Sequence, residues 1–131
     1  MGAARLSLLA GLLALAVPAL AQESDWRPIS NAANGNFSVE FLADASSLRR
    51  QGDVIEFIER AEFTNQRFGW KQVISQTQIN CRFNRSRTLR MRITKTDGTV
   101  EVLDQRKVAK WAAIVPESNG AFARDFVCKA K

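Results

Sequence analysis

The sequence predicts an α+β fold: a single domain in which several antiparallel strands are followed by one C-terminal helix that is tethered by a disulfide. Alternation of apolar and polar residues, which is typical of half-buried strands, recurs between residues 37 and 102. Helical spacing of apolar residues comes only after Pro116, and the two cysteines, Cys81 and Cys128, fall in a predicted strand and at the end of that helix. Strands followed by a single helix are typical of an antiparallel sheet with the helix on one face.

The first 21 residues have the features of an export signal. Arg5 supplies a positive charge, residues 6–17 form an apolar run, and Ala19 and Ala21 form a small-x-small cleavage site. The apolar run is shorter than the roughly 20 residues that a membrane span needs. We therefore expect a signal peptide at residues 1–21, a mature domain at residues 22–131 and no transmembrane segment.

Export would place the two cysteines in an oxidising compartment. Compartments outside the cytoplasm are oxidising, so Cys81 and Cys128 are expected to form a disulfide. A redox pair would more typically show close C-x-x-C spacing, and the long separation favours a structural bridge. In the loop-closure model, such a bridge stabilises the fold by roughly 4 kcal/mol.

The composition of the mature chain narrows the classes of function. Eighteen Lys and Arg and thirteen Asp and Glu give it a formal charge of +5. This charge suits anionic glycans, anionic lipids or acidic proteins, although it also serves solubility alone. An exported protein rarely meets nucleic acid, so we expect none as a partner. The chain has no histidine and no tyrosine, and histidine is the usual general base and a common zinc ligand. We expect no enzymatic activity, no metal and no cofactor.

The predicted strands are separated by turn signals. Asn34-Gly35-Asn36 is one such turn, and Asp97-Gly98 marks a hairpin. The residues at every second position that are expected to share one face are Phe37, Val39 and Phe41, then Val73, Ser75, Thr77, Ile79, Cys81 and Phe83, then Leu89, Met91 and Ile93.

Residues 54–63 are ambiguous. As a strand, Ile55, Phe57, Ala61 and Phe63 would share one face, with Glu59 intruding among them. The acids at positions 53, 56, 59 and 62 recur with a helical period, which slightly favours a helix. The β-branched and aromatic residues favour a strand.

Two local motifs receive a structural interpretation. Asp44, Ser46 and Ser47 resemble a catalytic cluster only superficially, because no histidine or lysine base accompanies them, and we interpret them as a turn. Ser118 is predicted to cap the final helix. The aromatic residues Phe122 and Phe126 share one face of that helix, and Cys128 lies at or just past its end.

A set of residues in a particular order and spacing supports a family assignment. The set comprises Trp26, Asp44-Ala45-Ser46-Ser47-Leu48 with Arg49 and Gly52, Cys81, Trp111 with Ile114, Pro116 and Ser118, and Val127-Cys128. Through these residues, almost the whole mature chain resembles the bacterial surface-adhesin protein E-like family. The resemblance implies a six-stranded antiparallel sheet with a disulfide-linked C-terminal helix, and a strand at residues 54–63.

The resemblance also carries expectations about location. It implies an exported protein of a Gram-negative bacterium, in a family named for an adhesin that binds host matrix and serum proteins. Gln22 follows the cleavage site, where a cysteine would carry a lipid anchor. We therefore expect no lipid anchor and a soluble periplasmic protein, with secretion or display on the cell surface as alternatives.

The candidate binding residues are six cations in residues 82–95, a stretch without any acid. They are Arg82, Arg85, Arg87, Arg90, Arg92 and Lys95. On a strand, Arg90 and Arg92 project from the same face about 7 Å apart, and arginine suits sulfate, phosphate and carboxylate. The alternative is a solvated face whose charge is balanced by acids on a neighbouring strand. Those acids would be Glu56, Glu59 and Glu62.

The remaining candidates are the three tryptophans. Trp26, Trp70 and Trp111 could line a ligand groove or, more commonly, cover the core and its edges. We interpret the protein as an exported, non-enzymatic binding module of the bacterial cell envelope, with adhesin-like binding through the basic strand face. The alternative is a soluble periplasmic accessory protein for envelope upkeep or complex assembly, with no adhesive role.

Overall fold

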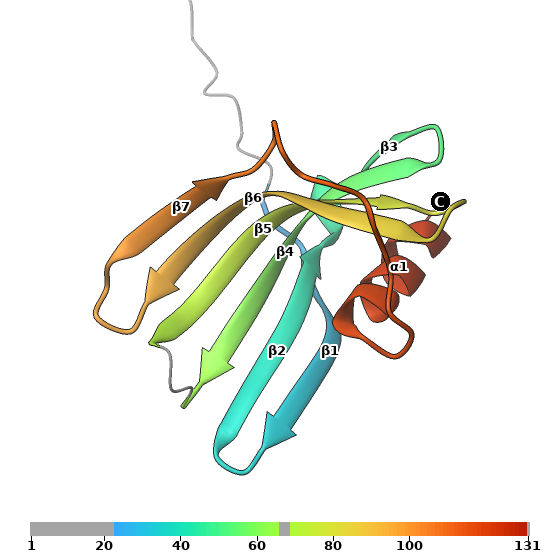
Figure 1. The fold of residues 1–131 in the computed structure, drawn as a ribbon. Helices are drawn as coiled ribbons and strands as arrows, with labels where there is room; N and C mark the ends of the chain where they lie inside the picture. Colours follow the sequence, from blue (N-terminus) through green and yellow to red (C-terminus); the bar gives the residue numbers. More distant parts are fainter. Residues whose placement is uncertain (1–22, 66–68, 131) are drawn as a thin grey trace, which may run out of the picture.

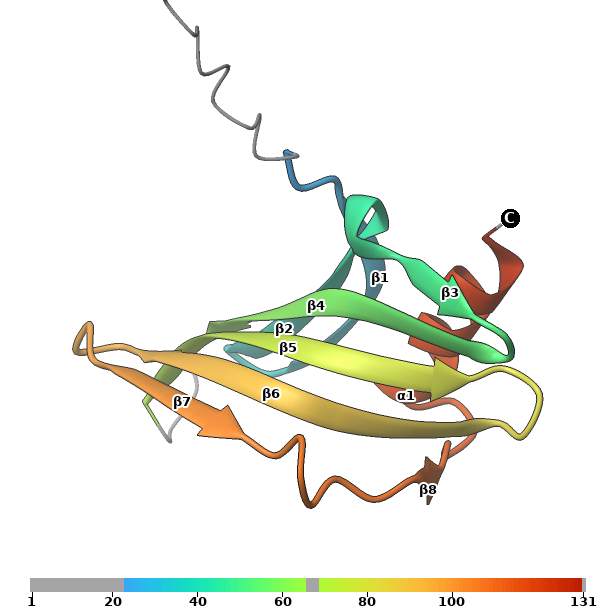
Figure 2. The same ribbon diagram turned by 90° about the horizontal axis from the view of Figure 1, so that it is seen from above.

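The dominant feature of the structure is an antiparallel sheet that curls into a half-barrel, with a helix packed against one of its faces (Figures 1 and 2). The computed structural model describes residues 23–65 and 69–130. The predicted signal peptide lies outside the described residues. The single domain, the antiparallel sheet and the C-terminal helix confirm the predicted fold class.

Six strands follow one another across the sheet in the order β1-β2-β4-β5-β6-β7, and two short segments, β3 and β8, pair with β4 and β6. The strands are β1 (Trp26–Asn34), β2 (Phe37–Asp44), β3 (Arg49–Gln51), β4 (Val54–Thr64), β5 (Trp70–Asn80), β6 (Arg85–Lys95), β7 (Val100–Asp104) and β8 (Ala112–Ala113). A 3-10 turn, η1 (Ala45–Ser47), follows β2, and the helix is α1 (Asn119–Lys129). The six-strand path agrees with the number that the family resemblance implied.

Residues 54–63 form a strand at the centre of the sheet, between β2 and β5. Ile55 and Phe57 are almost completely buried on one face of β4. The helical spacing of the acids was misleading, because strand alternation sends Glu56 and Glu62 to one face and Glu59 to the other. The strand that the resemblance implied is therefore confirmed.

The helix divides the sheet into two unlike faces. We call the face against which α1 packs the inner face and the opposite one the open face. Figures 1 and 2 show α1 at the end of the sheet where the turn from β5 to β6 lies, away from the turn between β6 and β7. Below the helix, an apolar cluster joins Ala43, Ile55, Phe57 and Ile79 to Val127 of α1.

The helix begins as predicted and buries one side against the sheet. The Ala121 amide donates to Ser118 Oγ at 3.2 Å, so Ser118 is the N-cap. The buried side is formed by small residues, including Ala123 and Val127, which let the helix approach the sheet closely. Phe122 is 46% exposed while Phe126 packs on the core, so the side that these two residues share is only partly buried.

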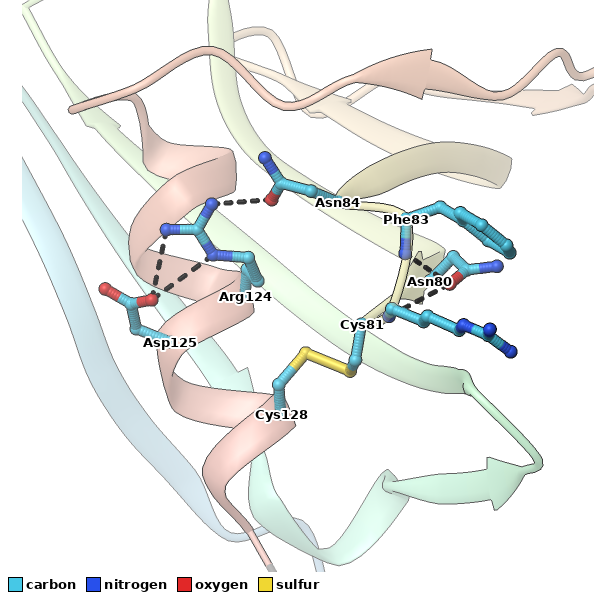
Figure 3. Close-up of a disulfide and its surroundings, with 8 residues drawn as sticks. Asn80, Cys81, Phe83, Asn84, Arg124, Asp125 and Cys128 are labelled. Atoms are coloured by element: carbon cyan, nitrogen blue, oxygen red, sulfur yellow. Dashed lines mark hydrogen bonds and ion pairs between the residues drawn. A yellow bond between two sulfur atoms is a disulfide. The ribbon is translucent and has the colours of Figure 1, made fainter.

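The predicted disulfide joins Cys81, directly after β5, to Cys128 in the last turn of α1 (Figure 3). Their Cα atoms are 5.8 Å apart. The turn after β5 is held by Asn80, whose Oδ1 accepts from the amides of Arg82 and Phe83. This turn carries Phe83 out to solvent, where it is 62% exposed, and the prediction that it continues the inward-facing series is wrong.

Candidate functional site

A β-bulge at Leu89 determines where the arginines of β6 lie. Gln76 on β5 is opposite Arg90, but its neighbour Thr77 is opposite Thr88, so Leu89 is an extra residue. Simple alternation would place residues 85 and 87 on the side opposite to Arg90. The bulge instead brings four arginines to the open face, which we call the arginine face: Arg85, Arg87, Arg90 and Arg92.

The other two predicted cations lie elsewhere. Arg82 is in the turn between β5 and β6, where its Nη1 is 3.9 Å from Oδ2 of Asp53. Lys95 is on the same side of β6 as Ile93, on the inner face, and its Nζ is 3.6 Å from Oε2 of Glu101. The six candidates therefore divide into a group of four and two separate, acid-paired residues.

Arg87 is held in place by its neighbours on the open face. Its Nε donates to Oε1 of Gln78 at 2.8 Å, and its guanidinium carbon lies 4.5 Å from the centre of the Trp111 ring. The same Gln78 donates from Nε2 to Oε1 of Glu56 at 3.0 Å. A glutamine on β5 thus links the arginine on β6 to an acid on β4.

The predicted balance of charge by the β4 acids is only partly present, because β5 separates β4 from β6. Glu62 pairs instead with Arg60 on its own strand, with Nε and Oε1 2.9 Å apart. Glu59 projects to the inner face, away from the arginines. Of the three acids, Glu56 alone is connected to the arginine face, through a neutral side chain.

The nearest acid across the strands is Asp104, which is opposite Arg90. Hydrogen bonds from Arg106 are the main cause that lowers the pKa of Asp104 to about 2, and the charge of Arg90 contributes less. Asp104 is therefore shared between two cations. Arg85 and Arg92 form no side-chain hydrogen bond or ion pair within residues 23–65 and 69–130.

The arginine face borders an apolar groove of about 390 Å³. Arg90 and Arg92 lie at this groove together with Ile58, Ile74, Val100 and Val102. These aliphatic residues occupy positions that solvent-facing polar residues usually fill, and Val100 and Val102 are about half exposed at 47% and 51%. The sequence analysis did not predict this apolar groove. The signal for it was that Ile58 and Ile74 lie at the outward-facing positions between the inward-facing residues of β4 and β5.

The three tryptophans have different surroundings. The ring of Trp26 stacks with Arg60, whose guanidinium carbon is 4.3 Å from its centre, much as Trp111 covers Arg87. Trp70 packs edge-on against Phe63, with ring centres 6.2 Å apart, in a hollow of the inner face. Two tryptophans therefore cover arginine side chains, and one lines a hollow.

The Asp44 motif forms the predicted turn. Oδ1 of Asp44 accepts from the amide of Ser46 at 3.0 Å and from the amide of Asp25 at 2.8 Å. The hydroxyl of Ser47 donates to the Asp44 carbonyl and accepts from the Ile58 amide. Burial acts to raise the pKa of Asp44, but these hydrogen bonds to its carboxylate outweigh burial, and the pKa is lowered.

The described residues contain neither a membrane-spanning helix nor a cluster of metal ligands. α1 is too short and too polar to be a candidate membrane-spanning helix, and no other helix in the described ranges qualifies. In the same part of the chain, no three side chains of His, Cys, Asp or Glu are grouped as ligands for a metal.

The fold and the site define a small, disulfide-linked α+β domain whose open face combines arginines with an apolar groove. The chain belongs to the surface-adhesin protein E family, whose family model matches residues 26–129. No curated protein and no solved structure matches the chain. Family membership and the disulfide indicate an exported protein with an adhesin-type binding role.

Proposed function

We propose that this protein is a non-enzymatic binding module of the bacterial cell envelope that binds anionic ligands through its arginine face. The proposal includes a signal peptide at residues 1–21 and a mature domain at residues 22–131 that is released into the periplasm. Its ligands would be sulfated or carboxylated glycans, anionic lipids or acidic proteins. The observation that carries the proposal is the bulge at Leu89, which gathers four arginines on one face.

The chemistry of the face supports anion binding. A planar guanidinium can donate two parallel hydrogen bonds to a sulfate, phosphate or carboxylate. Arg92 keeps its donors available, because it forms no ion pair or side-chain hydrogen bond within the described part of the chain. The adjacent groove lined by Ile58, Ile74, Val100 and Val102 would contact the apolar part of a ligand and exclude water from the charged contacts.

A salt-dependent binding measurement tests this proposal. The mature protein should be retained on immobilised heparin at low salt and elute as salt rises, because exposed charges are screened over about 8 Å at physiological ionic strength. The double variant Arg90→Glu/Arg92→Glu should lose retention. The matched control Arg50→Glu/Lys129→Glu makes the same change in net charge at two exposed residues outside the face, and it should keep most of the retention.

The comparison of the two variants decides between a specific face and a general charge effect. Equal loss in both would show that net charge alone binds heparin, and full retention of the Arg90/Arg92 variant would remove the face from the mechanism. Thermal unfolding of each variant checks that the fold is intact. Unfolding of the Arg90/Arg92 variant would show that these arginines have a structural role, through Asp104 or other neighbours.

A further inference from the structure

The half of the inner face that α1 does not cover contains a hollow of about 210 Å³. Its walls include three aromatic side chains and a methionine from four strands: Phe41, Phe63, Trp70 and Met91. Glu59 and Ser75 also line it. It is separate from the arginine face, which lies on the opposite side of the sheet.

Glu59 is the residue that the fold alone does not explain. The other inner positions of β4 are apolar, and they include Phe57 on one side of Glu59 and Ala61 on the other. Directly opposite Glu59 across the strands are Ala43 on β2 and Ser75 on β5, and neither carries a charge. A carboxylate among such neighbours costs stability unless a partner compensates it, and such residues are concentrated at functional sites.

Burial raises the pKa of Glu59 to about 7, so the carboxylate is partly ionised at neutral pH. Three described cations on neighbouring elements have partners other than Glu59. Arg27 of β1, which is opposite Ala43, pairs with Asp25. Lys95, farther along the inner side of β6, pairs with Glu101. On α1, Arg124 donates to Asn84 and Asp125 (Figure 3). An added cation would therefore find a negative charge in the hollow.

The aromatic walls suit such a cation. The planes of Phe63 and Trp70 meet at 73°, so the two rings form a corner. A cation is attracted to the face of an aromatic ring, more strongly where water is excluded, and quaternary ammonium groups are recognised in this way. An acid at the same place adds charge complementarity and excludes anions.

We propose that this hollow binds a small organic ammonium ion, with the charged nitrogen against the Glu59 carboxylate and the apolar groups against Phe63, Trp70 and Met91. The volume fits a small solute better than a protein segment. The site would give the protein a second ligand of opposite charge to the one bound by the arginine face. It does not depend on the proposed function, and the two can be tested separately.

Choline and its uncharged analogue 3,3-dimethyl-1-butanol, in which carbon replaces the quaternary nitrogen, are matched probes. Binding is followed by NMR through the indole N–H signals, because the chain has three tryptophans and one of them, Trp70, lines the hollow. Choline should shift the Trp70 signal and leave those of Trp26 and Trp111 in place. Glu59→Gln should weaken choline binding about ten-fold or more, a difference of roughly 1.4 kcal/mol.

Two further variants make the result specific. Glu62→Gln, which removes an acid from the open face of the same strand, should bind choline as the parent does. Glu59→Asp keeps the charge and should retain part of the affinity. Choline affinity of the parent should rise between pH 6 and pH 8, as Glu59 loses its proton, and that of Glu59→Gln should stay constant.

The proposal is overturned if Glu59→Gln binds choline as tightly as the parent, or if the uncharged analogue binds more tightly than choline at pH 8. Either result would make the hollow an apolar site without selectivity for cations. Shifts confined to Trp26 or Trp111 would place the cation elsewhere and also overturn it. Loss of heparin binding in the arginine variants leaves this site unaffected, so each proposal can fail alone.

Discussion

The two halves of the inner face are built from the same strands but differ in how they are covered. Under α1, Ile55 and Phe57 of β4 are almost completely buried. In the other half, Phe63 of the same strand and Trp70 of β5 are only partly buried and line the hollow around Glu59. An 11-residue helix is about 16 Å long, and the disulfide fixes it at one end of the sheet. One half of the inner face therefore supplies stability, while the other keeps accessible apolar surface.

The largest expected effect contrasts two phenylalanines of β4. Phe57→Ala should lower the free energy of unfolding by about 3–5 kcal/mol, because Phe57 is 1% exposed and its loss leaves a cavity under the helix. Phe63→Ala should cost less than half as much, since its side chain already borders solvent. Urea unfolding of both variants measures the difference. Equal losses would show that the uncovered half is packed as tightly as the core.

Removal of the disulfide should act on the helix-covered half. The double variant Cys81→Ser/Cys128→Ser should lose about 2–5 kcal/mol of unfolding free energy, because the bridge closes a loop between residues 47 positions apart. Hydrogen exchange should accelerate most in α1 and least in the β6–β7 hairpin. An unchanged unfolding free energy would mean that apolar packing alone holds the helix.

Titration of Glu59 should have the smallest effect on the free energy of unfolding, and it should make that free energy depend on pH. Its pKa is about 7 in the folded chain and 4.5 as its ordinary value, so the folded state binds more protons between these values. Stability should therefore fall as pH rises from about 4.5 to 7, by at most about 3 kcal/mol. Glu59→Gln should remove this slope and be more stable than the parent at pH 8.

Glu62→Gln serves as the control in the same series of unfolding measurements. Glu62 lies on the open face beside Arg60, and its variant should keep the slope of the parent. A parent whose stability does not change between pH 5 and pH 8 would contradict the burial of Glu59.

The sequence located most of the elements but not the faces they present. Alternation located β2, β5, β6 and β7, while the strand at residues 54–63 followed only from the family resemblance and β1 was not predicted. Ser118 and the cysteines located the helix and its attachment, since these signals are local. Which side of α1 packs against the sheet depends on how closely its side chains fit against the strands, and this cannot be read from the helix sequence alone. Ala123 and Val127 pack closer than Phe122 could, and the spacing of Phe122 and Phe126 did not predict this.

The candidate site shows the same limit more sharply. Simple alternation along β6 correctly predicted that Arg90 and Arg92 lie on the same face of the sheet. The bulge at Leu89 depends on pairing with β5, and it moves Arg85 and Arg87 to the face opposite to the one that alternation predicts. Glu59 was visible in the sequence as a charge in an apolar series. Its aromatic surroundings come from β2 and β5, which no local pattern connects to it.

The position of α1 in the chain also dictates the order of assembly. A ribosome makes residues 119–129 after every strand of the sheet, so Ile55, Phe57 and Ile79 have no cover until α1 has been made. A sheet that exposes such a cluster is an unfinished, marginal structure. A chain in which α1 has not yet been made therefore lacks the element that completes this core. Closure of the Cys81–Cys128 bond then makes completion of the fold the last event, after the chain has reached an oxidising compartment.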